Sequence, residues 1–334
     1  MKSFFKANLY GVKLYWILVP LLLSIICIII GSFLDLQISQ AFVSQESPFG
    51  MFGEGLSMIP IFIMGTIASS MIGGGLFQSK KKGFKILGIV LLVIGIVIMA
   101  YETYKFTYGE YAFEEWFDET FSNGKVFAYL FGFIIQCPFA GFFFFFKKKD
   151  PVICLKVGLF IVLLIALQAA LIHLIKIACY RPRYRFLAGY SFDDGQRVYA
   201  PSERIQYYRG WYEGWRWFDP SIYKDKSNPI LYASNKDYVS SFPSGHTGAA
   251  MVALALPLLL VPFGIKEEKK KIILPIASFI GLGYLIIVGI ARIRFGAHFC
   301  SDVGFAVFLV SLLMIGIYFL IKKLPIRFEK EADL

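Results

Sequence analysis

The sequence predicts an all-α membrane protein. The expected fold is a polytopic transmembrane helical bundle of about eight spans, with both termini cytoplasmic and a long extracytoplasmic loop. The 334 residues are 57% hydrophobic and only 17% charged, whereas soluble domains are about half apolar and about a quarter charged. The apolar residues form blocks close to the roughly 20 residues that a membrane-spanning helix needs. The basic residues collect at the ends of alternate blocks, which is typical of cytoplasmic connections.

Eight apolar stretches have the composition of membrane spans, although the third and sixth are short. In chain order they are residues 14–34, 56–76, 84–101, 126–146, 152–175, 247–264, 272–291 and 303–321. The first stretch follows several lysines but lacks the short apolar core and the small-residue cleavage site of a signal peptide. We therefore expect it to be an uncleaved first span.

The distribution of charge predicts the side of the membrane on which each connection lies. Residues 35–55 contain no Lys or Arg, and residues 102–125 carry six acidic and two basic residues. The other connections and the end of the chain are rich in basic residues: Lys80, Lys81, Lys82, Lys85, Lys147, Lys148, Lys149, Lys266, Lys269, Lys270, Lys271, Lys322, Lys323, Arg327 and Lys330. Because Lys and Arg are enriched in cytoplasmic loops, both termini are predicted to be cytoplasmic and the 176–246 loop extracytoplasmic.

The remaining composition limits the partners and cofactors that we expect. A net charge of +11 is compatible with nucleic-acid binding, but the basic residues follow the topology pattern, so we expect a lipid bilayer and no nucleic acid as partner. No carboxylate cluster or Cys/His set has metal-ligand spacing, so we expect no metal and no cofactor. Whether Cys179 and Cys300 meet is left open by the sequence.

The chain divides into three predicted parts. Residues 1–150 form an N-terminal extension of four spans. Residues 151–325 form a core that includes the 176–246 loop, and residues 326–334 form a cytoplasmic tail. Three polar clusters lie in the core, each at the predicted outward end of a span: KIACYRPRY at 176–184, SFPSGHT at 241–247 and ARIRFGAHFCSD at 291–302.

Each cluster contains residues suited to binding or moving a phosphoryl group. Lys176 and Arg183 are seven positions apart, so a continuous helix would place them on one face. The segment 243–245 suits a first helical turn, whose free N–H groups and positive dipole end can hold an anion. His298 and Asp302 are four positions apart and can touch across one helical turn.

Taken singly, these features have ordinary explanations, because cations at helix ends often extend to the headgroups and Ser-Gly-His often begins a helix. Taken together, these features indicate a site that binds and transfers a phosphoryl group. Cations beside an N–H nest describe a phosphate site, and His246 and His298 can supply an acid and a nucleophile. In the absence of a metal-ligand set, the combination predicts a metal-free phosphoryl transfer. Arg181 and Arg294 are expected to be lipid-facing or structural.

The three clusters resemble the signatures of the type 2 phosphatidic acid phosphatase superfamily, which includes lipid phosphate phosphatases, glucose-6-phosphatase and vanadium haloperoxidases. The family pattern is Lys-x6-Arg-Pro, then Pro-Ser-Gly-His, then Ser-Arg-x5-His-x3-Asp. The matching residues here are Lys176, Arg183, Pro243, Ser244, Gly245, His246, Arg292, His298 and Asp302. Tyr184 replaces a Pro of the pattern and Ala291 replaces a Ser. The resemblance covers roughly residues 170–322, and the first four spans exceed the two that usually precede the first motif.

The resemblance implies a role for each matched residue. His298 would attack phosphorus and form a phosphohistidine, Asp302 would orient His298, and His246 would protonate the leaving oxygen. The residues implied to hold the phosphoryl oxygens are Lys176, Arg183, Ser244, Gly245 and Arg292.

The embedded fold further suggests a lipid phosphate or diphosphate as substrate at the outer leaflet of a bacterial cell membrane. Its class would be phosphatidic acid, phosphatidylglycerol phosphate or undecaprenyl diphosphate. Two alternatives stay open: a lipid phosphotransferase that uses an acceptor other than water, and a non-catalytic lipid transporter.

Overall fold

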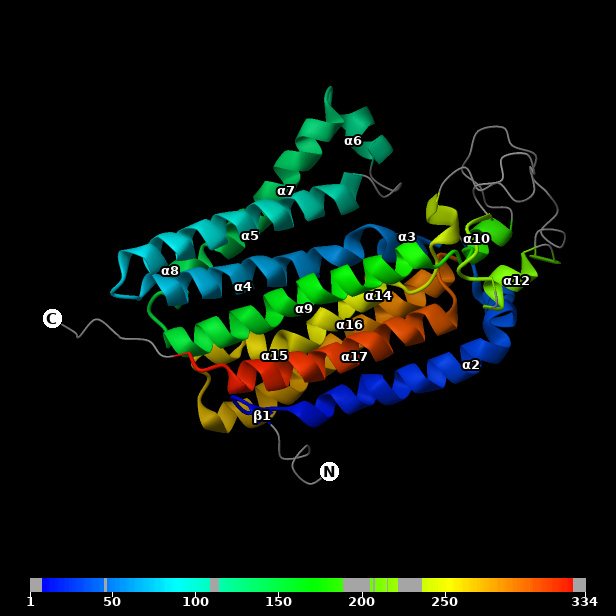
Figure 1. Cartoon of the computed structure of the whole chain (residues 1–334). Helices are drawn as coiled ribbons and strands as arrows, with labels where there is room; N and C mark the ends of the chain where they lie inside the picture. The colour runs from blue at the N-terminus through cyan, green and yellow to red at the C-terminus, as the bar shows by residue number, and fades with distance from the viewer. Residues whose placement is uncertain are drawn as a thin grey trace.

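The computed structural model describes residues 8–44, 47–108, 114–188, 205–206, 208–214, 216–221 and 236–326, and it is a bundle of long helices lying side by side (Figure 1). Eight helical stretches within these ranges are long and apolar enough to cross a membrane: Leu14–Phe42, Leu56–Phe77, Lys82–Tyr108, Gly124–Phe146, Pro151–Ala178, Gly245–Phe263, Glu267–Arg294 and Cys300–Lys323. The predicted all-α, eight-span fold is therefore confirmed. The first stretch extends well beyond its predicted end at residue 34, and the predicted tail after Ile326 lies outside the described residues.

The described chain contains α-helices, short 3-10 helices and one two-stranded hairpin. The α-helices are α2 (Leu18–Phe42), α3 (Pro48–Glu54), α4 (Ile59–Phe77), α5 (Lys82–Tyr108), α6 (Glu114–Thr120), α7 (Gly124–Ala140), α8 (Phe142–Phe146), α9 (Pro151–Ala178), α10 (Tyr184–Leu187), α12 (Arg209–Tyr212), α14 (Gly245–Ala250), α15 (Leu256–Leu259), α16 (Glu267–Arg294) and α17 (Cys300–Lys323). The 3-10 helices are η1 (Leu14–Ile17), η2 (Leu56–Met58), η3 (Lys236–Val239), η4 (Met251–Ala255) and η5 (Val261–Phe263), and the antiparallel strands are β1 (Asn8–Leu9) and β2 (Val12–Lys13).

The helices of the predicted extension pack directly on the predicted core. Helix α2 lies along α17, and α4 lies between α5 and α9. A Cβ atom on Gly95 of α5 would lie 2.5 Å from the Cβ atom of Ser69, and one on Gly158 of α9 would lie 2.8 Å from the carbonyl oxygen of Ala68. Small residues at such contacts let helix backbones approach closely, which drives helix association in a bilayer. Glycine on both neighbours therefore allows α4 to join the two halves of the protein.

Buried polar side chains also connect three helices of the extension with one another. Thr66 of α4 donates to the side-chain oxygen of Gln136 at 2.7 Å, and the amide nitrogen of Gln136 donates to Thr103 of α5 at 2.8 Å. All three residues are buried. Because a buried polar group without a partner is costly, this chain of hydrogen bonds favours one arrangement of α4, α5 and α7.

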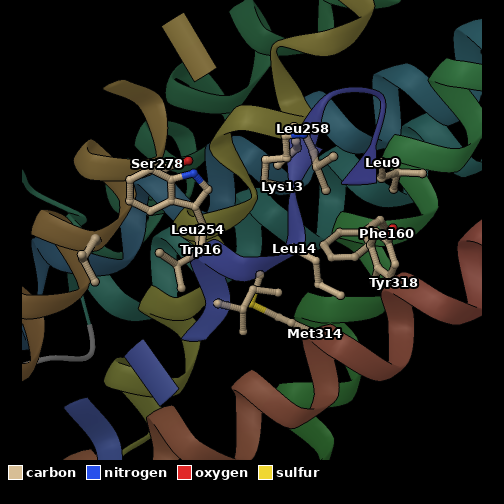
Figure 2. A pocket seen from close by; sticks show the side chains of 13 residues that line it. Leu9, Lys13, Leu14, Trp16, Phe160, Leu254, Leu258, Ser278, Met314 and Tyr318 are labelled. Carbon is tan, nitrogen blue, oxygen red and sulfur yellow. The ribbon is translucent and has the colours of Figure 1, made fainter. Parts of the chain in front are cut away.

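The β1–β2 hairpin lies at the end of the bundle opposite α10 and α12 (Figure 1). Figure 2 shows Leu14, Phe160 and Met314 around a small pocket beside this hairpin. The pocket has a volume of about 40 Å³. A volume of this size holds about one or two water molecules. The packing around this pocket is mainly apolar, and the polar clusters that the sequence singled out lie at the other end of the bundle.

Candidate active site

A cavity of about 910 Å³ runs along α4, α5 and α9 and ends among polar side chains near the start of α10. Six of the eight predicted site residues line it: Lys176, Arg183, Gly245, His246, Arg292 and His298. Away from this polar end the lining is mostly apolar and includes Ile72, Leu91 and Val162. The two remaining predicted residues, Ser244 and Asp302, are buried. The fold thus brings together motifs that are more than a hundred residues apart in the chain.

His298 lies in the turn between α16 and α17. The turn is made by Gly296, whose φ of +68° is a left-handed conformation that glycine adopts without strain. The Nδ1 atom of His298 lies 2.5 Å from the carbonyl oxygen of Ser241. Since a carbonyl oxygen only accepts, Nδ1 carries the proton and Nε2 keeps its lone pair. His298 is therefore held in the tautomer that a nucleophile requires.

Asp302 holds His298 less directly than its position in the sequence suggests. Helix α17 begins at Cys300, so His298 and Asp302 do not share a helical turn, and the Nδ1–Oδ2 distance is 3.8 Å. This distance is too long for a hydrogen bond. The carboxylate of Asp302 instead accepts from the hydroxyl of Ser241 and from the backbone N–H of Phe299. The residue that Asp302 fixes is thus Ser241, and the carbonyl group of Ser241 orients the imidazole.

A buried ion-pair network supports this arrangement. Arg181 pairs with Asp302 and, at 2.8 Å, with Asp35 of α2. The three side chains are almost fully buried. Of the two roles expected for Arg181, the structural one is correct and the lipid-facing one is wrong. Breaking a buried pair of this kind leaves an unpaired charge, which costs about 3–5 kcal/mol.

The surroundings of His298 keep its ring neutral. Burial disfavours the charged imidazolium, and the nearby cations Lys176 and Arg292 disfavour it further, so the pKa of His298 is well below the usual value of 6.5. The contact with Asp302 acts in the opposite direction and is the largest single influence after burial, but burial and the cations together outweigh it. At neutral pH the imidazole is therefore unprotonated, as attack on phosphorus requires.

His246 lies in the first turn of α14, which begins after the N-cap Ser244. Its Nε2 atom lies 2.9 Å from the backbone carbonyl oxygen of Glu54 and therefore donates to it. Its ring and that of Phe106 of α5 are nearly perpendicular, with centroids 5.2 Å apart. The hydroxyl of Ser244 is bonded to the hydroxyl of Thr247 at 2.8 Å, so Ser244 shapes the helix start, and its contact with phosphate stays a prediction.

The cations of the first motif reach the cavity without a shared helix. Helix α9 ends at Ala178, because Pro182 disfavours helical backbone at the residue before it. A continuous helix, the condition under which the spacing would place Lys176 and Arg183 on one face, is therefore not formed, although both side chains line the same cavity. The Nζ atom of Lys176 donates to the carbonyl oxygen of Ser240, and a Cβ atom on Gly245 would lie 3.8 Å from Cε of Lys176.

Three further charged residues, which the sequence did not single out, complete the site: Glu54, Arg185 and Asp237. Arg183 pairs with Asp237, and Arg185 pairs with the same carboxylate at 3.2 Å and with Glu54 at 3.3 Å. Although burial disfavours the charged form of Asp237, Arg183 and Arg185 hold its pKa below the usual value, so it is ionised at neutral pH. Arg185 follows the motif by two positions and could have been found on that ground. Nothing in the sequence indicates that Glu54 would lie beside the third motif.

Two guanidinium groups of the site keep an unused hydrogen-bond donor. Within the described part of the chain, the Nε atoms of Arg185 and Arg292 are buried without a hydrogen-bond partner. An unsatisfied buried donor costs about 1–3 kcal/mol, and a phosphoryl oxygen is a strong acceptor. These groups are therefore suited to an anion that enters the polar end of the cavity.

The two cysteines that the sequence left open do not form a disulfide. Both Cys179 and Cys300 are free thiols, and the Sγ atom of Cys300 lies 3.7 Å from the carbonyl oxygen of Cys27.

Comparison with protein-family models gives a match to the PAP2 superfamily over residues 157–325. The matched segment is half of the chain and contains every predicted site residue from Lys176 to Asp302. It leaves out Glu54 and all of α4 and α5. No curated protein and no solved structure matches the chain.

Proposed function

Because the chain belongs to the PAP2 superfamily, which includes phosphatases of phosphate esters, we propose that it is an integral membrane phosphatase that hydrolyses a lipid phosphate or diphosphate. The observation that carries the lipid part of this proposal is the form of the cavity. Its polar end contains two histidines and several cations, and the rest runs between membrane-spanning helices and is mostly apolar. A ligand with a charged head and a long hydrocarbon chain complements both parts.

The geometry supports a reaction in two steps. In the first, His246 takes up a proton from solvent when the anionic substrate binds beside it. Nε2 of His298 then attacks phosphorus, the bond from phosphorus to the lipid oxygen breaks, and His246 gives this proton to that oxygen. In the second, water gives a proton to His246 and attacks the phosphohistidine, which releases inorganic phosphate and restores His298. Lys176, Arg183 and Arg292 stabilise the charge on the phosphoryl oxygens in both transition states. The scheme uses side chains of this protein and one water molecule, and no step in it involves a metal.

We further propose that the site opens to the outer leaflet, with both termini cytoplasmic. The lysine-rich connections follow α4, α8 and η5, and the site residues lie at the opposite ends of the helices. Cytoplasmic connections are enriched in Lys and Arg, so this distribution favours an extracytoplasmic site in the cell membrane.

The proposal is tested by phosphate release from a panel of substrates. The purified protein in detergent, with a metal chelator present, is given phosphatidic acid, phosphatidylglycerol phosphate, undecaprenyl diphosphate and a soluble sugar phosphate. We expect at least one lipid to be hydrolysed with a much higher kcat/KM than the sugar phosphate. Hydrolysis of the sugar phosphate alone would show that the substrate is not a lipid.

The same assay tests the orientation of the site. Sealed right-side-out vesicles are given a membrane-impermeant phosphate ester that the detergent assay has shown to be cleaved. We expect hydrolysis before the vesicles are opened and little increase afterwards. Hydrolysis that begins only after permeabilisation would place the site on the cytoplasmic side.

A further inference from the structure

Glu54 brings a negative charge into the cationic end of the cavity. It is the last residue of α3, in the N-terminal extension, and lies outside the segment that matches the PAP2 superfamily. Its side chain is almost completely buried. Burial of a carboxylate is costly unless the carboxylate is paired, so the contacts of Glu54 are the first clue to its role.

Both carboxylate oxygens of Glu54 engage guanidinium groups of the site. One oxygen pairs with Arg292, which is predicted to hold the phosphoryl group, and the other lies 3.3 Å from Nη1 of Arg185. Among the described residues, Glu54 is the one acid that forms an ion pair with Arg292. Carboxylate and phosphate bind guanidinium in the same way, through oxygen atoms that accept from its planar fork of N–H donors. The side chain of Glu54 thus holds the donors that a phosphoryl group would use.

The charge balance of the cavity indicates how Glu54 affects the attraction of the site for phosphate. Cations outnumber carboxylates by two among the described residues that line the cavity: Lys105, Lys176, Arg183, Arg185 and Arg292 against Glu54, Glu102 and Asp237. A phosphate monoester or free phosphate carries a charge of about −1.5 to −2 at pH 7. Without Glu54 the attraction for phosphate would be stronger, and release of the product correspondingly slower.

We propose that Glu54 is an internal competitor for the phosphoryl group. In the empty site its carboxylate occupies Arg292 and Arg185, and an entering phosphoryl group displaces it from these donors. When phosphate leaves, the carboxylate returns and compensates the two cations. Glu54 therefore sets the affinity of the site for phosphate, and with it the susceptibility of the enzyme to inhibition by its own product. This role rests on the proposed phosphatase function.

The test is equilibrium binding of radiolabelled orthophosphate to the purified full-length protein. We expect Glu54→Gln to lower the Kd for phosphate by about tenfold or more, because one competing charge next to Arg292 is removed. The backbone carbonyl that receives the His246 hydrogen bond is retained in this variant. Glu267→Gln, which removes the same charge from an exposed position at the start of α16, should leave the Kd unchanged.

A purely structural role for Glu54 predicts the opposite sign. If the carboxylate only held Arg292 in place, Glu54→Gln would weaken phosphate binding, so an unchanged or higher Kd overturns the proposal. Glu54→Asp keeps the charge but shortens the side chain by one methylene, and its Kd should lie between those of wild type and Glu54→Gln. If Glu54→Gln does not fold, the Kd of Glu54→Asp for phosphate becomes the deciding measurement. A Kd for Glu54→Asp that is no lower than that of wild type contradicts the competitor role.

The outcomes also separate this inference from the proposed function. Binding of phosphate to wild type with no effect of Glu54→Gln rejects the competitor and leaves the phosphatase intact. If neither wild type nor Glu54→Gln binds phosphate, both the phosphate site and the competitor are rejected. Because binding is measured without turnover, the result does not depend on knowing the lipid.

Discussion

At the scale of single residues, the site combines a neutral nucleophile with several basic side chains. Burial and the nearby charges of Lys176 and Arg292 disfavour the protonated form of His298. The backbone carbonyl of Ser241 selects the tautomer in which Nε2 is free. The same cations that would hold the phosphoryl group therefore also keep the nucleophile unprotonated.

This coupling predicts the pH dependence of a Lys176→Met variant. A cation near His298 lowers the pKa of the imidazole, so removing Lys176 raises that pKa. The nucleophile is then lost at a higher pH as the solution is acidified. We expect the acid limb of kcat/KM against pH to move to higher pH in Lys176→Met, in addition to a fall in kcat.

The profile is measured on the residual activity of the variant with the same substrate as wild type, so that ionisation of the substrate affects both curves equally. Lys156→Met is the matched control, because Lys156 is on the same helix α9 but does not line the cavity. An acid limb that stays in place in Lys176→Met would show that this lysine does not act on the charge of the nucleophile.

The residue scale also shows what could be predicted from the sequence. Spacing and resemblance selected Lys176, Arg183, His246, Arg292 and His298, and all five line one cavity. The route by which Asp302 acts could not be predicted, because spacing of four residues implies a shared helical turn and the start of α17 at Cys300 removes it.

At the scale of elements, α4 and α5 give the protein a longer cavity than its polar site alone would need. These helices form one wall and α9 forms the other, so the extension and the core both line the apolar part. If a lipid chain occupies this part, a large side chain placed there should obstruct long chains more than short ones. The small exposed Ala169 of α9 is a suitable position.

We expect Ala169→Trp to raise KM for a long-chain lipid phosphate by about tenfold, which corresponds to lost contact of about two methylene groups. A short-chain, water-soluble analogue should keep its KM and kcat. Ala170→Trp is the matched control, because Ala170 is exposed on the same helix but does not line the cavity. Equal effects of Ala169→Trp on long and short chains, or equal effects of the two variants, would exclude chain binding in this cavity.

The spans could be predicted from the sequence, but their neighbours could not. Long apolar stretches and basic connections indicated eight helices, because the bilayer requires both features. In a membrane the lipid-facing and protein-facing sides of a helix are both apolar, as in α5, where Gly88 and Ala100 are buried and Ile94 and Ile98 are exposed. Hydropathy therefore does not reveal which face packs against α4.

At the scale of the whole molecule, the extension and the core form one functional unit. Asp35 of α2 pairs with Arg181, Glu54 of α3 pairs with Arg292, and Phe106 of α5 contacts His246. The N-terminal extension thus supplies a contact to each of the three motifs. Because the motifs all lie after residue 175, the sequence predicts residues 1–150 as a separate extension, and the contacts that join the two parts depend on the folded bundle.

The central claim is that His298 receives the phosphoryl group, and trapping the phosphorylated protein tests it most directly. Wild type and His298→Ala are mixed with a phosphate-labelled lipid that wild type hydrolyses, quenched within one turnover, and tested for bound label and for free phosphate. We predict label on wild type that is stable in alkali and lost in acid, as a phosphohistidine is, with neither label nor phosphate release from His298→Ala. Substantial phosphate release by folded His298→Ala would contradict the account.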